Sequence, residues 1–185
     1  MALMQRGYPS TKRVQGGVQR IFVSEDPMDF TITGQSITAF DSQSGAANNA
    51  MLYAYDINPA STPQAGGASS LNVGDAGNSH THTITSQFVG LTSGSLEEIV
   101  GLSDAAGLTV FVETYNADND DTGASYLVYG VNREMTLASA DAATGVALND
   151  LSGVPFTIVG TSTNPAYVLD GDLASVAGSG ITINE

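Results

Sequence analysis

The chain has 185 residues, 42% of them hydrophobic, and no cysteine. It can therefore build one domain with a core, but no disulfide, thiolate metal site or cysteine nucleophile. Its formal net charge of −14 excludes a protein that binds nucleic acid or an anionic membrane through a basic surface. The first residues lack the apolar segment of a signal peptide and no apolar run is long enough to cross a membrane, so we expect synthesis in the cytoplasm.

Charge divides the chain into a short basic segment and an acidic body. The first twenty residues contain no acid and four of the five bases: Arg6, Lys12, Arg13 and Arg20. The remaining residues contain one base, Arg133, and all 19 acids. Pro9 and the Gly16-Gly17 pair predict that residues 1–16 form an irregular arm ahead of a single domain over residues 17–185. The four bases are candidates for contacts between subunits, or the arm is simply a solvated terminus.

Alternating apolar residues predict strands in the first part of the domain, over residues 18–23, 30–33, 36–40 and 51–57. A turn is expected at Gly34. Residues 58–78 contain two prolines, four glycines and almost no large apolar residue, so we expect a long hairpin loop there.

The chain's two histidines follow this loop, in the stretch NSHTHTITSQF. His80 and His82 are two residues apart, so in a strand both side chains lie on one face. They could supply part of a metal site together with acids from other segments. The alternative is a plain strand returning from the hairpin, because the alternation of Thr with other residues continues without a break beyond the histidines. We favour the plain strand.

A single helix is expected over residues 95–106. Ser95 as the N-cap and Glu98 three residues later fit a capping box. One face of the helix carries Leu96, Ile99, Val100 and Ser103. Gly107 fits the position after the helix. Strands are expected afterwards over residues 108–113, 125–131, 134–138, 154–160 and 166–169. The predicted fold is mainly β: an antiparallel sandwich or barrel of about eight strands with one short flanking helix.

Residues 118–123, DNDDTG, resemble the start of a calcium-binding loop, with Asp118 and Asp120 at its first and third positions. The acid required at position 12 is absent, because Tyr129 stands there. An acidic turn between two strands is the better interpretation, and adventitious calcium is the alternative. With two histidines and one arginine in the body, the residues for acid–base or nucleophilic catalysis are few. We therefore expect no enzyme activity and no cofactor.

Several segments in this order resemble virion proteins of tailed bacteriophages. They are GGVQRIFVS, SHTHTITSQF, SLEEIVGLSDAAGLTVFVE and YLVYGVNREMTLASADAATGVALNDLSGVPFTIVG. Together they look like the small tail tube proteins (major tail proteins), and the similarity covers residues 16–169. The loop at 58–78 is longer than the hairpin expected in that family.

The resemblance implies a β-sandwich subunit that assembles into rings, typically hexameric, which stack into a hollow tube. One sheet of each subunit would join its neighbours in a barrel lining the lumen, and the long hairpin or the N-terminal arm would reach the adjacent ring. DNA would pass through without specific binding, and an acidic lumen would repel its phosphates. The protein would then reside in the virion after assembly in the host cytoplasm, with other tail proteins as partners and no membrane contact.

Two alternative functions remain. A capsid decoration or head–tail connector protein would also be acidic, rich in β structure and free of catalytic residues. A metal- or carbohydrate-binding β-sandwich module would instead bind its ligand at His80 and His82 or at the acidic turn around Asp118 and Asp120.

Overall fold

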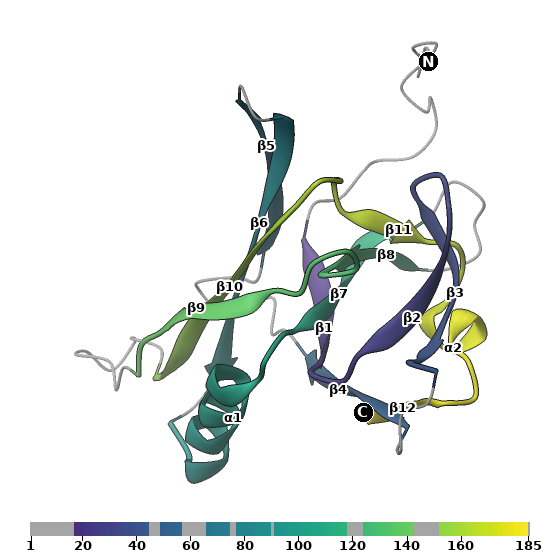
Figure 1. The fold of residues 1–185 in the computed structure, drawn as a ribbon. Coiled ribbons are helices and arrows are strands. Elements are labelled where there is room, and N and C mark those ends of the chain that lie inside the picture. Colours follow the sequence, from purple (N-terminus) through teal and green to yellow (C-terminus); the bar gives the residue numbers. More distant parts are fainter. Residues whose placement is uncertain are drawn as a thin grey trace.

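The computed structural model describes residues 17–44, 49–56, 66–74, 77–89, 91–117, 124–142 and 152–184. These residues form a large sheet, a small sheet and two helices (Figure 1). The large sheet has the order β12-β4-β1-β7-β8-β11-β3-β2 and the small sheet the order β5-β6-β10-β9. The expected mainly β sandwich with a flanking helix is confirmed, although the described residues form twelve strands rather than about eight.

The large sheet consists of β1 (Val18–Ser24), β2 (Met28–Thr33), β3 (Ser36–Ser42), β4 (Ala50–Asp56), β7 (Thr109–Ala117), β8 (Ala124–Tyr129), β11 (Tyr167–Leu169) and β12 (Ile181–Asn184). Most neighbouring strands are antiparallel, but β11 pairs with β3 and β12 pairs with β4 in parallel. The strands expected at 18–23, 30–33, 36–40, 51–57, 108–113, 125–131 and 166–169 all lie in this sheet. The expected turn between β2 and β3 is present, with Gly34 at φ +67°.

The large sheet curls over one of its own faces. Phe30 in the edge strand β2 lies 6.4 Å from Phe111 in the central strand β7, measured between ring centroids. Phe40 in β3 lies 5.0 Å from the same ring. In a flat sheet β2 and β7 would be about 19 Å apart, because three strands separate them and each spacing is about 4.8 Å. The curl therefore encloses an apolar core within the large sheet.

A second core lies between the two sheets. The curled core includes Phe22, Ile37, Leu52 and Val128, and the second core includes Ile21, Val110, Ile84 and Ile158. Neighbouring residues of β1 and β7 supply the two cores alternately, because successive side chains of a strand point to opposite faces. The central strands of the large sheet are thus buried on both sides, which explains their nearly continuous apolar sequences.

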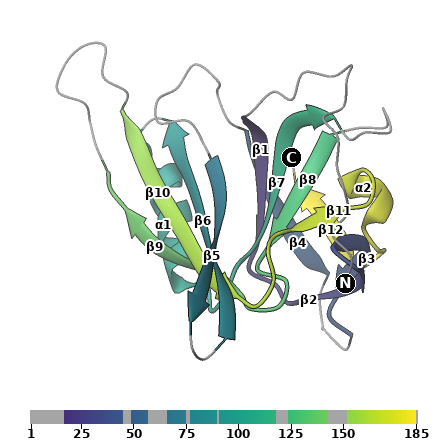
Figure 2. The same ribbon diagram turned by 90° about the horizontal axis from the view of Figure 1, so that it is seen from above.

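The small sheet consists of β5 (Gly66–Gly74), β6 (Gly77–Val89), β9 (Thr136–Ala140) and β10 (Gly153–Ser162). It lies opposite the large sheet (Figure 2). The strands expected at 134–138 and 154–160 are β9 and β10. The stretch NSHTHTITSQF is the return strand of a hairpin, as predicted, and it pairs with β5 on one side and β10 on the other.

The prediction of a loop over residues 58–78 is wrong for the part that the structure describes. Residues 66–74 form β5, and residues 77–78 already belong to β6. β5 consists mainly of Gly, Ala and Ser, so its side chains give no strand signal of their own. It forms a strand because the backbone of β6 pairs with it along its whole length, from Gly66 opposite Thr85 to Gly74 opposite Gly77.

Helix α1 (Ser93–Asp104) confirms the expected helix but begins earlier than predicted. Its N-cap is Thr92, whose hydroxyl accepts a hydrogen bond from the backbone N–H of Ser95. The Ser95 hydroxyl accepts one from the backbone N–H of Thr92 in return, at 2.9 Å. Ser95 is therefore the third helical residue of the capping box rather than the N-cap. The first turn of α1 therefore contains no acid, and Glu98 lies beyond it.

The apolar residues expected on one face of α1 are not buried together. Leu102 is the buried residue of α1, and Ile99 packs partly against the core between the sheets. Leu96 and Val100 are 43% and 58% exposed. The helix ends with Ala105 in an extended conformation, so Gly107 is not its terminating residue. Gly107 is buried against Glu134, whose side chain occupies the position that a Cβ would need.

A short helix, α2 (Leu173–Val176), and β12 follow the last strand predicted from the sequence. The turn between them ties the two ends of the large sheet together. The Gly178 N–H donates to the carbonyl of Phe40 at 2.7 Å, and the Gly180 N–H donates to Asp41 Oδ1 at 2.8 Å. These bonds hold the β3 end of the curled sheet near β12. In the described part of the chain, no helix combines the length and apolar character needed to cross a membrane.

Candidate functional site

The four strands of the small sheet contain no Asp, Glu, Lys or Arg. In the large sheet, by contrast, Arg20, Asp29, Asp41, Asp56 and Glu113 all lie in strands. The charge of the chain is therefore carried outside the small sheet. Sequence patterning alone missed this segregation, although the absence of charge from residues 66–74, 77–89, 136–140 and 153–162 was a visible signal.

The outward-facing side chains of β6, β10 and β9 form what we call the hydroxyl face. Rows of residues that lie opposite one another on β6, β10 and β9 define this face. One row is Thr85, Thr157 and Ser139, and the next is Thr83, Val159 and Thr136. Thr81 and Thr161 form a further row. The inward-facing residues of the same strands, such as Ile84 and Ile158, are fully buried in the core between the sheets. Arg133 and Glu134 stand at one margin, around a shallow hollow shared with Thr81 and Thr136.

Within the described part of the chain, no strand pairs with the outer edge of β5 or of β9, although α1 lies close to β9. β5 and β9 end the strand order, so each has one neighbour. β9 is five residues long and contains a bulge in which Ala138 has no partner on β10. An open edge presents unpaired backbone N–H and C=O groups, which can pair with a strand of another chain. The small sheet can therefore be extended on either side.

As predicted, the two histidines lie on one face of β6, with their rings stacked at 6.4 Å, and this face points inward. His82 is buried and lies edge-on against Tyr129, at 5.4 Å between ring centroids. Its Nε2 is 2.8 Å from Ser162 Oγ. Because the Ser162 hydroxyl donates its proton to the carbonyl of Asn164, it accepts from His82, so Nε2 carries the imidazole proton.

This arrangement favours the neutral form of His82. Its other nitrogen, Nδ1, is buried without a hydrogen-bond partner among the described residues. Burial lowers the pKa of His82 below its ordinary value of 6.5, the nearby His80 lowers it further, and the backbone hydrogen bond with Asn164 opposes the change. The imidazole therefore serves as a packed, neutral part of the junction between the sheets.

The remaining candidate residues are only partly covered by the structure. Asp118 and Asp120 lie outside the described residues, as do Arg6, Lys12 and Arg13. Within the described ranges, no three His, Asp or Glu side chains are grouped closely enough to hold a metal ion. Arg20 lies in β1, with its guanidinium 5.7 Å from the ring of Phe22 and with Glu113 as its cross-strand partner in β7. It therefore belongs to the sheet rather than to the N-terminal arm.

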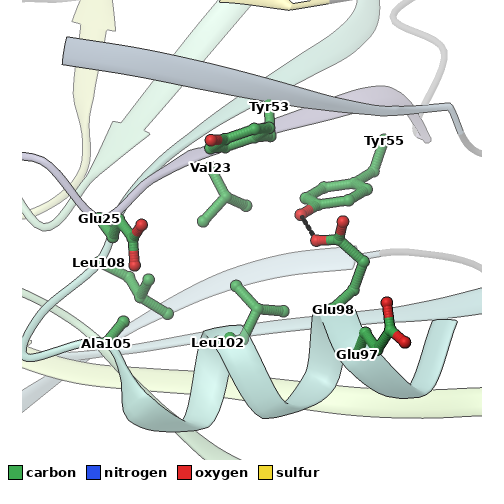
Figure 3. Close-up of a pocket in the computed structure, with 10 residues that line it drawn as sticks. Val23, Glu25, Tyr53, Tyr55, Glu97, Glu98, Leu102, Ala105 and Leu108 are labelled. Atoms are coloured by element: carbon green, nitrogen blue, oxygen red, sulfur yellow. Dashed lines mark hydrogen bonds between the residues drawn. The ribbon is translucent and has the colours of Figure 1, made fainter. Parts of the chain in front are cut away.

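A cleft of about 240 Å³ lies between α1 and the strands β1 and β4 (Figure 3). Val23, Leu102 and Leu108 form its buried apolar floor. Three exposed carboxylates, from Glu25, Glu97 and Glu98, stand around it together with two half-buried tyrosines, Tyr53 and Tyr55. Sequence patterning did not single out this cleft, because its walls come from three segments far apart in the chain.

One hydrogen bond holds the rim of the cleft together. The hydroxyl of Tyr55 donates to Glu98 Oε2 at 2.9 Å, joining β4 to α1 (Figure 3). Burial, and then this hydrogen bond and the charge of the same carboxylate, raise the pKa of Tyr55 well above its ordinary value, so the hydroxyl keeps its proton. The cleft thus combines an apolar base with a negatively charged opening.

No protein-family model and no curated protein matches this chain.

Proposed function

We propose that this protein is a structural virion protein, a tail tube subunit that assembles into rings stacked into a hollow tube through which DNA passes. The resemblance in the sequence suggests this role. The observed architecture supports it, because a two-sheet sandwich with one flanking helix is the subunit that the resemblance implies.

The observation that carries the proposal is the small sheet, with its two open edges and its charge-free strands. In a ring of six copies, joining β9 of one subunit to β5 of the next would give a barrel of about 24 strands. At a strand spacing of about 4.8 Å and a tilt of about 40°, such a barrel would be about 48 Å across between backbones. This leaves room for a DNA duplex inside the layer of side chains.

The hydroxyl face is suited to the wall of such a channel. DNA is held on protein surfaces chiefly by Lys and Arg side chains at its phosphates, and none occurs in these strands. Our expectation of an acidic lumen is revised accordingly: a lumen lined by the small sheet would be neutral. Acids of the large sheet, such as Asp29 and Asp41, would then surround the channel rather than line it.

Electron microscopy of the purified protein tests this proposal directly. We expect hollow rings or tubes of uniform width at high protein concentration. The variant Ala138→Pro should prevent them, because a proline at the β9 edge removes a backbone donor that a neighbouring strand would need. Ala138 lies at a bulge, where proline is tolerated, so the isolated subunit should lose no more than about 1 kcal/mol of stability.

Ala138→Thr is the matched control, since it keeps the backbone N–H and favours a strand, and it should assemble like the wild type. Particles that remain monomeric or trimeric at every concentration would refute the tube proposal and favour a decoration protein. Single rings that never stack would favour a connector. Assembly of Ala138→Pro at wild-type concentrations would show that the β9 edge is not an interface.

A further inference from the structure

The cleft beside α1 has the chemistry of a receptor for one basic side chain. Its floor is apolar and its rim carries Glu25, Glu97 and Glu98, with no Lys or Arg among the residues that line it. Lys and Arg side chains have the complementary form, an apolar stem and a charged tip. The faces of Tyr53 and Tyr55 can add cation–π contacts. At about 240 Å³ the cleft is smaller than a typical pocket for a drug-sized ligand, so it suits a side chain better.

The sequence itself contains a segment of matching charge. Residues 1–16 include Arg6, Lys12 and Arg13 and no acid, whereas the body that contains the cleft is strongly acidic. Charge complementarity of this kind selects a partner and its orientation. The other two bases of the chain lie elsewhere: Arg20 is in β1 and Arg133 is beside the hydroxyl face.

The position of the cleft favours the arm of a second copy over the protein's own. The chain enters β1 at Val18, whereas the cleft is lined by Val23 and Glu25 at the other end of that strand, about 17 Å away. The arm joins β1 at the end away from the cleft, and both edges of β1 are already paired, with β4 and β7. In a head-to-tail stack along the direction of β1, the start of β1 in one copy would face the cleft of the next.

We propose that the cleft lined by Glu25, Glu97 and Glu98 binds a basic side chain from residues 1–16 of the next copy in a head-to-tail stack. The second copy comes from the self-assembly described under the proposed function, and the inference rests on that proposal. A heterologous contact of this type repeats along the stack, because each copy offers both an arm and a cleft. It would link successive rings while the small sheets link subunits within a ring.

Binding can be measured without any assembly. The receptor is the full chain with Arg6→Glu, Lys12→Glu and Arg13→Glu, whose own arm cannot fill the cleft. The probe is a synthetic peptide of residues 1–16, titrated calorimetrically at low salt. We expect binding that weakens at high salt, and no binding of the same peptide with its three bases replaced by Gln.

Adding Glu25→Gln and Glu97→Gln to the receptor should weaken binding by about tenfold, as expected for two partly exposed ion pairs. This pair leaves the hydrogen bond between Tyr55 and Glu98 intact. The matched control, Asp141→Asn with Asp170→Asn, removes two exposed acids outside the cleft and should leave the affinity unchanged. Equal affinity for all these receptors, or no binding at all, would overturn the proposed site.

A mixing experiment identifies the source of the arm. The chain with Arg6→Glu, Lys12→Glu and Arg13→Glu, which we call the reversed-arm chain, should fail to stack on its own. A chain with Glu25→Lys and Glu97→Lys should also fail to stack on its own. An equimolar mixture should stack, because the acidic arm of the reversed-arm chain meets the basic cleft of the other chain, and the basic arm of that chain meets the acidic cleft of the first. If stacking returns only in a chain that carries both sets of changes, and not in the mixture, the arm docks within its own copy and the second-copy assignment is overturned. If the peptide binds but the wild type forms no rings or tubes, the tube proposal fails while the basic-side-chain site stands.

Discussion

The contact between Phe30 and Phe111 tests the curl of the large sheet. We predict that Phe30→Leu and Phe111→Leu are energetically coupled, although the strands that carry them are four positions apart in the sheet order. Their ring centroids are 6.4 Å apart, within the range in which aromatic pairs contribute about 0.5–1.5 kcal/mol beyond the burial of their area. Each single substitution should cost about 1–2 kcal/mol, since Leu nearly fills the same volume.

Urea unfolding of the wild type, both single variants and the double variant gives the coupling energy. We expect the double variant to be less destabilised than the sum of the single ones by about 0.5–1.5 kcal/mol. Phe88→Leu combined with Phe111→Leu is the control, because Phe88 packs against the core between the sheets, and the two effects should add. A coupling below about 0.3 kcal/mol for Phe30 and Phe111 would refute the curled sheet, since residues about 19 Å apart in a flat sheet behave independently.

Three further outcomes are expected. Gly153→Ala should lower the free energy of unfolding by about 1–3 kcal/mol, because a Cβ there collides with the carbonyl of Phe88. Gly101→Ala should raise it by about 0.5–1 kcal/mol, because Gly101 lies in the exposed helix with open space around it. Chemical denaturation measures both changes. The pKa of His82 is lowered in the folded state, so the stability that this residue contributes is complete above pH 6.5 and is lost as the pH falls toward the folded pKa. The thermal unfolding temperature of His82→Gln should therefore depend less on pH in that window than the temperature of the wild type. Thr85→Lys, on the hydroxyl face, should make assembled tubes retain DNA at low salt in a filter-binding assay, and equal retention by wild-type tubes would contradict a neutral, non-adhesive wall.

Most strands of the large sheet could be predicted because their sequences alternate or are continuously apolar. β1 and β7 carry large apolar residues on both faces, and the two cores explain why. β6 could be predicted for a different reason: residue types alternate from His80 to Phe88, because one face of the strand is buried and the other is open. In these segments the local pattern and the final environment agree.

The predictions from the sequence were wrong where pairing or packing with distant residues determines the structure. β5 has few apolar side chains, and its strand conformation depends on the backbone of β6. At α1, both Thr92 and Ser95 are good N-caps three residues apart, so local chemistry cannot choose between them. Separately, the burial of Leu102 between the sheets orients the helix and leaves Leu96 and Val100 exposed. The parallel pairings of β11 and β12 likewise have no local signature.

The distribution of charge connects the two proposed interfaces. A protein with 19 acids and five bases repels copies of itself unless its contacts avoid or neutralise that charge. The small sheet avoids it, because strands free of charge can meet edge to edge without bringing like charges together. The cleft beside α1 instead uses it, because Glu25, Glu97 and Glu98 can attract the basic residues of the arm. Raising the salt concentration should therefore weaken contacts between rings more than contacts within a ring, so stacked tubes should separate into rings before the rings dissociate.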